Sequence, residues 1–236
     1  MHQESRVIDH LQFRAHVPGT DPKVPMDSPP LLRNLSEEAR MRLIGGASTR
    51  RSRRHDVVLN EGDAVTHVYL VRGGSFKLVR RSHGGRELIV RLVGAGGCFG
   101  ALARAFVSEV SAESLESSVH LRLPLSTLLR LAKENPDFAL DLLAYSEDCR
   151  LKAEALSVLL AHDSVSRRLA RLLRNESDAC SGRLLFPLSQ SEVASLIGST
   201  RETVCATLNR FRREGILQIQ HGEVRVRDRE RLLDIV

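Results

Sequence analysis

The chain has 236 residues, enough for one large domain or two ordinary ones with buried cores. Its net charge of +6 suits a polyanionic partner, although many basic proteins without such a partner share it. The four cysteines form no C-x-x-C pair, and the polar N-terminus lacks the apolar run of a signal peptide or membrane span. We therefore expect a cytoplasmic protein outside the membrane, with no metal site, no disulfide framework and no particular cofactor.

Residues 1–30 are polar, contain five prolines and show no sustained periodicity, which is typical of a flexible arm. A short helix is expected over residues 36–44, because Ser36 can cap its start and Gly45-Gly46 can end it. The arm and this helix precede a segment in which short β-type runs alternate with glycine-rich turns.

The next segment is predicted to be one all-β domain, which with the preceding helix spans residues 31–130. Glycine-rich turns recur there roughly every 8 to 12 residues, as in a barrel or sandwich. The short β-type runs between the turns cover residues 56–59, 68–71, 75–80, 87–93 and 119–123.

A long helix is expected over residues 136–162, within a connecting segment 131–163. One of its faces has the alternating spacing of four and three that is typical of a coiled-coil seam: Phe138, Leu142, Tyr145, Cys149, Lys152, Leu156 and Leu159. The alternative is a helix whose apolar face packs against its own domain. Because the seam is long and an arginine-rich segment follows it, we favour a dimerisation helix, with all of these residues except Lys152 as the dimer seam.

The last segment, residues 164–236, contains 13 Arg and no Lys against 9 acidic residues, so it holds +4 of the net charge. Arg can form paired hydrogen bonds with phosphate and with guanine edges, which Lys does less selectively. A solvated helix face is the alternative explanation. The concentration of arginine favours a nucleic-acid-binding domain.

Two helices joined by a short turn are expected within this segment, over residues 190–197 and 201–214. Ser189 and Glu192 have the spacing of a capping box at the start of the first helix. Gly198 can end that helix in the left-handed conformation, and Ser199 or Thr200 can cap the second.

In the second helix, Val204, Leu208 and Phe211 share one face, which is expected to be buried. Two short alternating strands follow around His221-Gly222 and form a hairpin, over residues 216–219 and 223–226. Helix, turn, helix and hairpin in this order predict a DNA-binding winged helix-turn-helix over residues 164–236.

Exposed residues near the start of such a second helix reach base edges in the major groove. We expect Arg201, Glu202 and Cys205 to face the bases, since Arg can donate two hydrogen bonds to guanine and Glu can accept one from cytosine. Other polar side chains around the turn, the second helix and the hairpin are expected to contact the DNA backbone: Ser189, Ser199, Thr200, Thr203, Asn209, Arg210, Arg212 and His221.

From about Leu31 to its C-terminus, the chain resembles the cyclic-AMP receptor protein/FNR superfamily of transcription regulators. The resemblance is carried by the segment "LSQSEVASLIGSTRETVCATLNRFRREGIL", the glycine-spaced β-domain and the long helix between them. It implies an α+β chain with an N-terminal β-roll, which is a cyclic-nucleotide-binding-like jelly roll, then a long dimerisation helix and a C-terminal winged helix-turn-helix. It also implies a homodimer that acts on an inverted repeat in double-stranded DNA, with RNA polymerase as a partner.

In that family, the Arg and Glu that match Arg201 and Glu202 contact bases. A third base-reading Arg often follows, at the position where this chain has Ala206. The resemblance therefore does not predict the operator sequence.

Family members that bind cyclic nucleotide use a glycine-rich turn, a Glu for the ribose hydroxyl, and an Arg followed by Ser or Thr for the phosphate. The matching effector-pocket positions are Gly100 and Ala101, then Val110 and Ser111, with Arg104 in the loop between them. Ala101 and Val110 lack the acceptor and the cation that this ligand requires. Control by cyclic AMP is therefore not expected, and the β-roll holds either another effector or none.

Three other possibilities follow from single residue types. Residues 1–35 contain no cysteine, which excludes an N-terminal iron–sulfur cluster, and the sequence singles out no haem ligand. Cys205 is either a redox-sensitive thiol near a helix start or a small packing residue. An enzyme is not expected, because Cys205 and His221 have no third orienting group. The alternative function is a small-molecule-binding regulatory module that acts through protein contacts.

Overall fold

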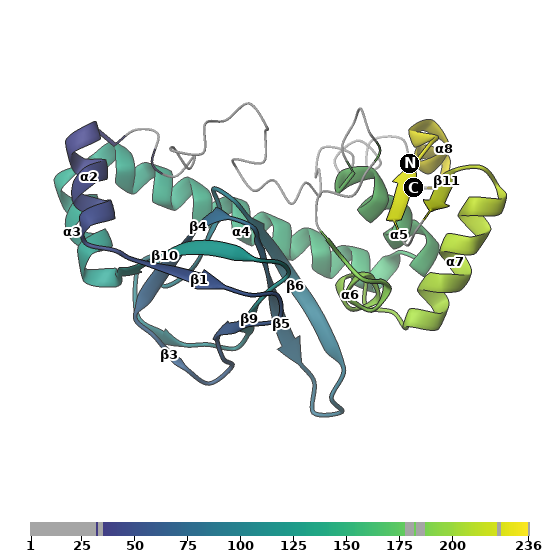
Figure 1. The fold of residues 1–236 in the computed structure, drawn as a ribbon, viewed down its shortest axis with the longest axis horizontal. Coiled ribbons are helices and arrows are strands. Elements are labelled where there is room, and N and C mark those ends of the chain that lie inside the picture. Colours follow the sequence, from purple (N-terminus) through teal and green to yellow (C-terminus); the bar gives the residue numbers. More distant parts are fainter. Residues whose placement is uncertain (1–31, 33–34, 178–181, 183–186, 221–222, 236) are drawn as a thin grey trace. The chain divides into compact units, whose positions relative to one another are not determined.

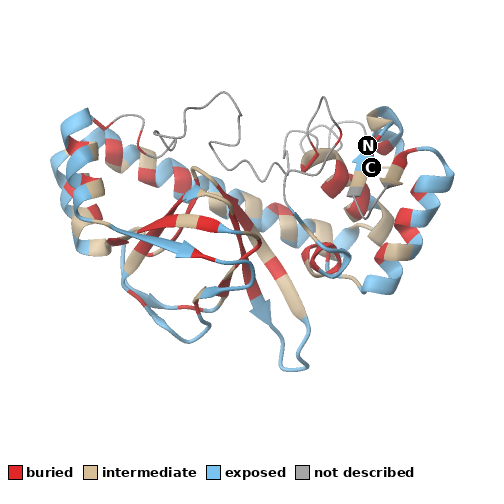
Figure 2. Ribbon diagram, in the orientation of Figure 1, coloured by how far each residue is buried: buried red, intermediate tan, exposed pale blue. Residues whose placement is uncertain are grey.

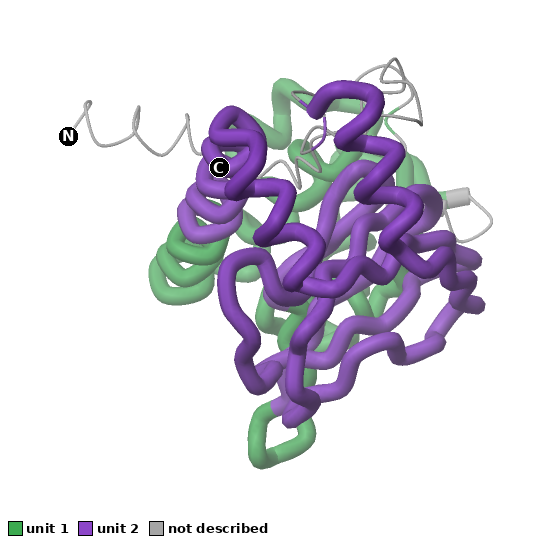
Figure 3. Tube along the Cα trace, turned by 90° about the vertical axis from the view of Figure 1, so that its left-hand side faces the viewer, with its two compact units in different colours: residues 1–15, 82–89, 152–236 green, residues 16–81, 90–151 purple. Residues whose placement is uncertain are grey.

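The structure is a computed structural model that describes residue 32 and residues 35–177, 182, 187–220 and 223–235. Its described residues form two compact units (Figure 3). One unit contains the residues up to 81 and residues 90–151, and the other contains residues 82–89 and those from 152 onward. The arm predicted over residues 1–30 lies outside the described residues, and the four segment boundaries given above stay predictions.

Two four-stranded sheets form the β-domain (Figure 1). In the first, the strand order is β1 (Ser48–Ser52), β10 (Ser118–Pro124), β4 (His67–Gly73) and β7 (Cys98–Gly100). In the second, it is β2 (Val57–Leu59), β9 (Ser111–Ser114), β5 (Ser75–Arg81) and β6 (Glu87–Gly94). A small sheet pairs β3 (Ala64–Val65) with β8 (Phe106–Val107). The predicted β-roll and the α+β class are thereby confirmed.

The side-chain alternation of β4 separates two hydrophobic clusters. Tyr69 and Val71 point between the sheets and pack with buried residues such as Phe76, Leu78, Phe99 and Ala112. Val68 and Leu70 point to the outer face of the first sheet. There they pack against three helices: α2 (Glu37–Gly45), α3 (Leu125–Glu134) and α4 (Pro136–His162).

The buried face of α4 is the face that the sequence predicts as a dimer seam. Phe138 is fully buried, and Leu142 and Tyr145 are 8% and 9% exposed, all within the cluster under the three helices. Cys149 packs against the same cluster. The seam prediction is therefore wrong for Phe138, Leu142 and Tyr145, because alternating spacing reveals an apolar face but not what covers it, and here a sheet covers it. It stays a prediction for three half-buried residues, Cys149, Leu156 and Leu159.

Tyr145 ties α4 to strand β7 through both backbone groups of Cys98. Its hydroxyl accepts a hydrogen bond from the Cys98 N–H at 2.9 Å and donates one to the Cys98 carbonyl at 2.7 Å. The Arg91 guanidinium donates to the same carbonyl, and to the Cys149 sulfur at 3.1 Å. Burial raises the pKa of the Tyr145 hydroxyl and raises the pKa of the Cys98 thiol to about 12, so both groups keep their protons at neutral pH.

The unit that contains residues 152–235 holds a winged helix. Its elements after α4 are α5 (Val165–Asn175), α6 (Gln190–Leu196), α7 (Arg201–Arg213), β11 (Leu217–Gln220), β12 (Glu223–Val226) and α8 (Arg229–Ile235). Helix α5 contacts α7 and α8, and α6 contacts α7. Figure 2 shows buried residues on the inward sides of these helices and exposed residues on their outward sides. Among the described helices, none combines the length and the apolar character needed to cross a membrane.

Most predicted helices and strands are present close to their expected bounds, and α4 covers residues 136–162 as predicted. Ser36 caps α2, since its hydroxyl accepts a hydrogen bond from the Ala39 N–H at 3.2 Å. The sequence does not predict β1, whose residues Ser-Thr-Arg-Arg-Ser carry no β-type apolar pattern and of which only Ser52 is buried. It also does not predict α3, which follows Pro124 without a side-chain cap.

Replacing Tyr145 with Phe should lower the free energy of unfolding by about 1–3 kcal/mol, because the buried N–H of Cys98 loses its acceptor. The matched control is Tyr69→Phe, since Tyr69 is the other tyrosine of the chain and its hydroxyl bonds no residue that the structure describes. Urea unfolding followed by circular dichroism measures both losses. Equal losses in the two variants would contradict the contact between Tyr145 and Cys98.

Candidate functional site

Helix α6 begins at a complete capping box, as predicted. The Ser189 hydroxyl accepts a hydrogen bond from the Glu192 N–H at 3.2 Å, and the Glu192 carboxylate accepts one from the Ser189 N–H at 2.7 Å. The box satisfies two backbone donors that a helix start otherwise leaves unpaired. It therefore fixes the start of α6, and the Ser189 hydroxyl already has a partner within the protein.

The turn between α6 and α7 depends on Gly198, whose φ of +61° is left-handed, as predicted. A Cβ atom at this position would lie only 2.7 Å from Leu160 Cδ2. Thr200 then caps α7, because its hydroxyl accepts a hydrogen bond from the Thr203 N–H at 3.3 Å. Glycine and threonine together set where the second helix begins.

Helix α7 has one buried face and one exposed face. The buried face carries Val204, Leu208 and Phe211, as predicted, together with Thr207. Arg201 and Glu202 are exposed in the first turn of the helix. The two side chains predicted to read bases therefore stand on a helix whose opposite face is anchored in its own unit.

Glu202 carries its charge at the start of α7. Its own backbone N–H lowers the pKa of this carboxyl, and the Thr200 hydroxyl lowers it further, so the group is ionised at neutral pH. The Cys205 sulfur is half-buried and lies 2.7 Å from Oε1 of Gln190, to which the thiol donates. Cys205, which the sequence predicts to face the bases, thus already has a hydrogen-bond partner on α6, Gln190.

The residues predicted to contact the DNA backbone fall into engaged and open groups. Arg210 donates to the Ser166 hydroxyl at 2.8 Å and lies 3.9 Å from the Glu214 carboxylate. Ser199 is half-buried, and His221 lies outside the described residues. The exposed members of the group are Ser189, Thr200, Thr203, Asn209, Arg210 and Arg212. Four of these side chains also bond within the protein: Ser189, Thr200, Thr203 and Arg210.

The predicted hairpin after α7 is present as the antiparallel pair of strands β11 and β12. Leu217 pairs with Val226, and Gln218 pairs with Arg225. Arg227 supports the pair from outside, because its guanidinium donates to the Gln218 side chain at 2.6 Å. The tight turn predicted at residues 221–222 lies outside the described residues.

The first part of the predicted effector pocket is closely packed. Gly100 has a φ of +98°, and a Cβ atom there would lie 2.4 Å from the His67 carbonyl oxygen. Ala101 is fully buried in the cluster between the sheets, and its N–H donates to the same carbonyl at 2.9 Å. At the position where the family places a Glu, this chain therefore presents a methyl group inside an apolar core.

The second part of that pocket also lacks a cation. Val110 is half-buried against the cluster between the sheets, and Ser111 accepts a hydrogen bond from the Glu61 N–H at 3.0 Å. Arg104 is exposed. The structure thus brings Gly100, Ala101, Val110 and Ser111 into one domain, and at Ala101 and Val110 it supplies apolar side chains.

A second apolar stripe lies on the face of α4 opposite Phe138, and the sequence prediction did not name it. Its large members are 39–65% exposed: Leu140, Leu143, Leu151 and Val158. Glu147 lies on the same face and pairs within the helix with Arg150 at 2.5 Å. The signal was present in the sequence, because these residues also repeat at helical spacing.

Two family models match the chain, one for each half. The model described as "Cyclic nucleotide-binding domain" matches residues 49–135, and the one described as "Crp-like helix-turn-helix domain" matches residues 167–235. The first covers β1 to α3, and the second covers α5 to α8.

Individual relatives agree with the family models. The chain is 30% identical over 184 residues to "Cyclic AMP receptor protein" of Thermus thermophilus, covering 75% of this chain and 83% of that one. It is 26% identical over 208 residues to "Probable transcriptional regulator flp" of Lacticaseibacillus casei, covering 87% and 94%. The solved structure of FixK2 from Bradyrhizobium japonicum has the same fold, with a TM-score of 0.73, 23% identity and coverage of 80% and 96%. The chain therefore belongs to the cyclic-AMP receptor protein/FNR family of DNA-binding transcription regulators.

Proposed function

We propose that this regulator acts as a homodimer that reads an inverted repeat in double-stranded DNA. The observation that carries the proposal is the pair Arg201 and Glu202, exposed in the first turn of α7 while the opposite face of that helix is buried. Side chains at this place in a helix-turn-helix reach base edges in the major groove. Dimers of this kind bind half-sites about 34 Å apart, or a multiple of that distance.

The chemistry of the two side chains supports base readout. Arg201 can donate two parallel hydrogen bonds to a guanine, and the ionised Glu202 can accept one from the amino group of a cytosine. Ala206 is exposed on the same helix and offers no hydrogen-bonding group, which removes one contact that relatives often have. The half-site of this protein is therefore expected to differ from theirs at one position.

Replacing Arg201 with Ala should cost about 1–3 kcal/mol of discrimination at one base-pair position of each half-site, because the paired hydrogen bonds are lost. Selection of bound DNA from a random pool identifies the preferred site. Fluorescence anisotropy then compares that site with a version mutated at the affected position. An unchanged preferred sequence in the variant would exclude Arg201 as a base-reading residue.

The control for this experiment is Arg212→Ala, which removes the same charge from the exposed face near the end of α7. A phosphate-contacting arginine should weaken binding to all sequences alike and reduce the salt slope by about one. If the wild-type protein binds random DNA fragments weakly and without salt dependence, the alternative function through protein contacts is favoured instead.

The proposed dimer uses the second apolar stripe of α4 instead of the buried face. Leu140 and Leu143 are 63% and 65% exposed, although burying one such side chain is worth about 1.5–3 kcal/mol. Parallel packing of two copies of α4 along this stripe would cover Leu140, Leu143, Leu151 and Val158 on both chains. The Glu147–Arg150 pair on this face gives the stripe a polar position that can fix the register of the two helices.

Replacing Leu143 with Arg should raise the dimer dissociation constant by at least about 100-fold, since the two-fold axis places the change on both chains. The matched control is Ser146→Arg, which adds the same charge on an exposed flank of α4 outside the stripe. Sedimentation equilibrium measures both constants. Equal effects of the two substitutions, or none from Leu143→Arg, would rule out the stripe as the dimer interface.

We further propose that cyclic AMP does not control DNA binding. The support is the apolar character of Ala101 and Val110, which cannot replace a ribose acceptor and a phosphate-binding cation. Allosteric effectors change affinity by roughly 5- to 150-fold. Anisotropy titrations of the selected operator should therefore give the same affinity with and without millimolar cyclic AMP, and a shift in that range would refute the proposal.

RNA polymerase is the proposed protein partner. The support comes from relatives whose names describe them as activators, such as "Transcriptional activator protein FnrA" of Stutzerimonas stutzeri, 25% identical over 185 residues. A regulator bound at an operator commonly acts on transcription through contact with the polymerase. Both activation and repression are compatible with the proposed DNA contacts.

A further inference from the structure

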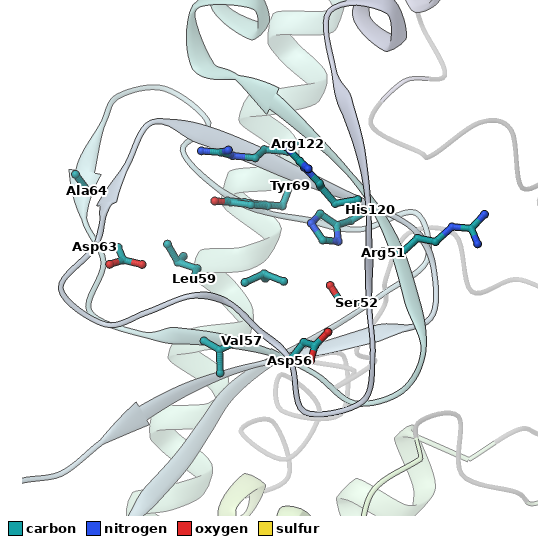
Figure 4. Close-up of a pocket in the computed structure, with 12 residues that line it drawn as sticks. Arg51, Ser52, Asp56, Val57, Leu59, Asp63, Ala64, Tyr69, His120 and Arg122 are labelled. Carbon is teal, nitrogen blue, oxygen red and sulfur yellow. The ribbon is translucent and has the colours of Figure 1, made fainter.

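A cavity of about 670 Å³ opens between β1, β2, β3, β4 and β10, within the unit that carries the β-roll (Figure 4). Ligand sites in proteins have volumes of roughly 300–1,000 Å³. None of the residues around this cavity belongs to the effector position taken from the family, which involves residues 100–111. It is therefore a separate feature of the β-roll.

The pairing of strands explains why one wall of the cavity is polar. Along β10, Leu121 and Leu123 belong to the cluster under the helices, so the alternate residues His120 and Arg122 face the inside of the roll. The register places Arg50 of β1 directly opposite His120. Three nitrogen-bearing side chains are thus brought to one wall from two neighbouring strands.

Two of these side chains have buried polar atoms without partners. His120 is 3% exposed, and its Nδ1 atom forms no hydrogen bond with any residue that the structure describes. The Nε atom of Arg122 is likewise buried and unpaired within the described residues, while its terminal nitrogen lies 3.4 Å from Nδ1 of His67. Leaving such groups unpaired costs free energy. Both atoms are closed off from the cavity space, so an anion there would meet the other nitrogen atoms of these side chains.

The His120 ring is held in place and uncharged. It packs at 5.9 Å from the Tyr69 ring and edge-on at 5.4 Å from the Phe76 ring. Burial lowers the pKa of His120, and the positive charge of Arg50 lowers it further. A neutral imidazole can donate one hydrogen bond to an anion, so it adds a directed contact to the charges of the arginines.

The opposite wall of the cavity carries the apolar side chains of Val57, Val58, Leu59 and Ala64. Figure 4 shows Leu59 and Val57 across the cavity from Arg122, with the Tyr69 ring between Arg122 and Leu59. Two carboxylates lie at its margin and are held by their own turns. Asp56 accepts a hydrogen bond from the Arg53 N–H at 2.6 Å, and Asp63 accepts one from the Asn60 N–H at 2.8 Å.

We propose that this cavity binds a small organic anion, a carboxylate or a phosphate ester, whose charged group contacts Arg50, His120 and Arg122 and whose apolar part lies against Tyr69 and Leu59. Arginine pairs well with either anion, because its planar guanidinium can donate two parallel hydrogen bonds to both. The apolar wall selects an anion that carries a hydrocarbon or aromatic body. Inorganic ions alone would leave that wall unoccupied.

The experiment uses three probes of one shape and different charge: benzoate, phenyl phosphate and the neutral benzyl alcohol. Calorimetric titration and His-ring NMR spectra of the full chain report binding, with the His120 signal assigned from its loss in His120→Gln. At least one of the two anions should bind saturably and shift that signal. The better anion identifies the carboxylate or the phosphate as the preferred group, and benzyl alcohol should bind at least about tenfold more weakly.

The variants separate the cavity from the surface charge around it. Arg122→Gln and Arg50→Gln should each weaken binding of the better anion by about tenfold or more. Arg53→Gln is the matched control, because Arg53 is an exposed arginine that follows the same strand closely and does not line the cavity. Melting temperatures verify that each variant is folded. If Arg122→Gln does not fold, Arg50→Gln alone tests whether the cavity arginines bind the anion.

Four results would overturn the proposal. The first is that neither anion binds up to the millimolar range, and the second is that benzyl alcohol binds as tightly as the anions. The third and fourth concern the variants. Arg53→Gln weakens binding as much as the cavity variants do, or the folded cavity variants bind as tightly as the wild-type protein.

Discussion

The outer face of the sheet β1-β10-β4-β7 is apolar and must be covered. This constraint determines how α4 packs and which side chains of β10 face the inside of the roll. Leu121 and Leu123 of β10 point to that face, and Phe138, Leu142 and Tyr145 of α4 pack in the same cluster. Since only one face of α4 can be used in this way, its opposite face stays exposed. The alternation of β10 likewise forces His120 and Arg122 to the inside. The proposed dimer stripe and the proposed anion cavity therefore arise from one packing requirement.

The same constraint explains an energetic contrast within the β-roll. On its helix side, polar groups such as the Tyr145 hydroxyl are paired with backbone atoms of Cys98. On the cavity side, buried nitrogen atoms of His120 and Arg122 are unpaired among the described residues. Burial without a partner is costly for polar atoms in a protein interior. The Tyr145 hydroxyl is thus fully paired on the helix side, whereas His120 and Arg122 each keep one unpaired nitrogen on the cavity side.

Much of the fold could be predicted from the sequence, because local signals were strong. The capping box at Ser189, the left-handed Gly198 and the apolar face of α7 are each determined by residues close together in the chain. Features that depend on residues far apart in the chain could not be predicted. The spacing of Phe138 and Leu142 identified a buried face of α4 but not the sheet that buries it, so these residues were expected to face a second chain.

The candidate sites divide in the same way. Arg201 and Glu202 were accessible to sequence reasoning, because their exposure follows from the periodicity of a single helix. The cavity was not, because its polar wall requires β1, and the sequence of β1 gives no strand signal. Without that strand, the register that sets Arg50 opposite His120 cannot be derived.

Gly198 affects the orientation of helix α7 relative to helix α6. Any side chain there would strain the backbone by about 1–2 kcal/mol and meet Leu160, a clash that a rotation of α7 relative to α6 would relieve. Such a rotation would leave the proposed base-reading residues chemically intact but would change the angle at which they enter the groove. Gly198 therefore helps to set the orientation of α7. On a helix with a different orientation, the same Arg201 and Glu202 would contact other base pairs.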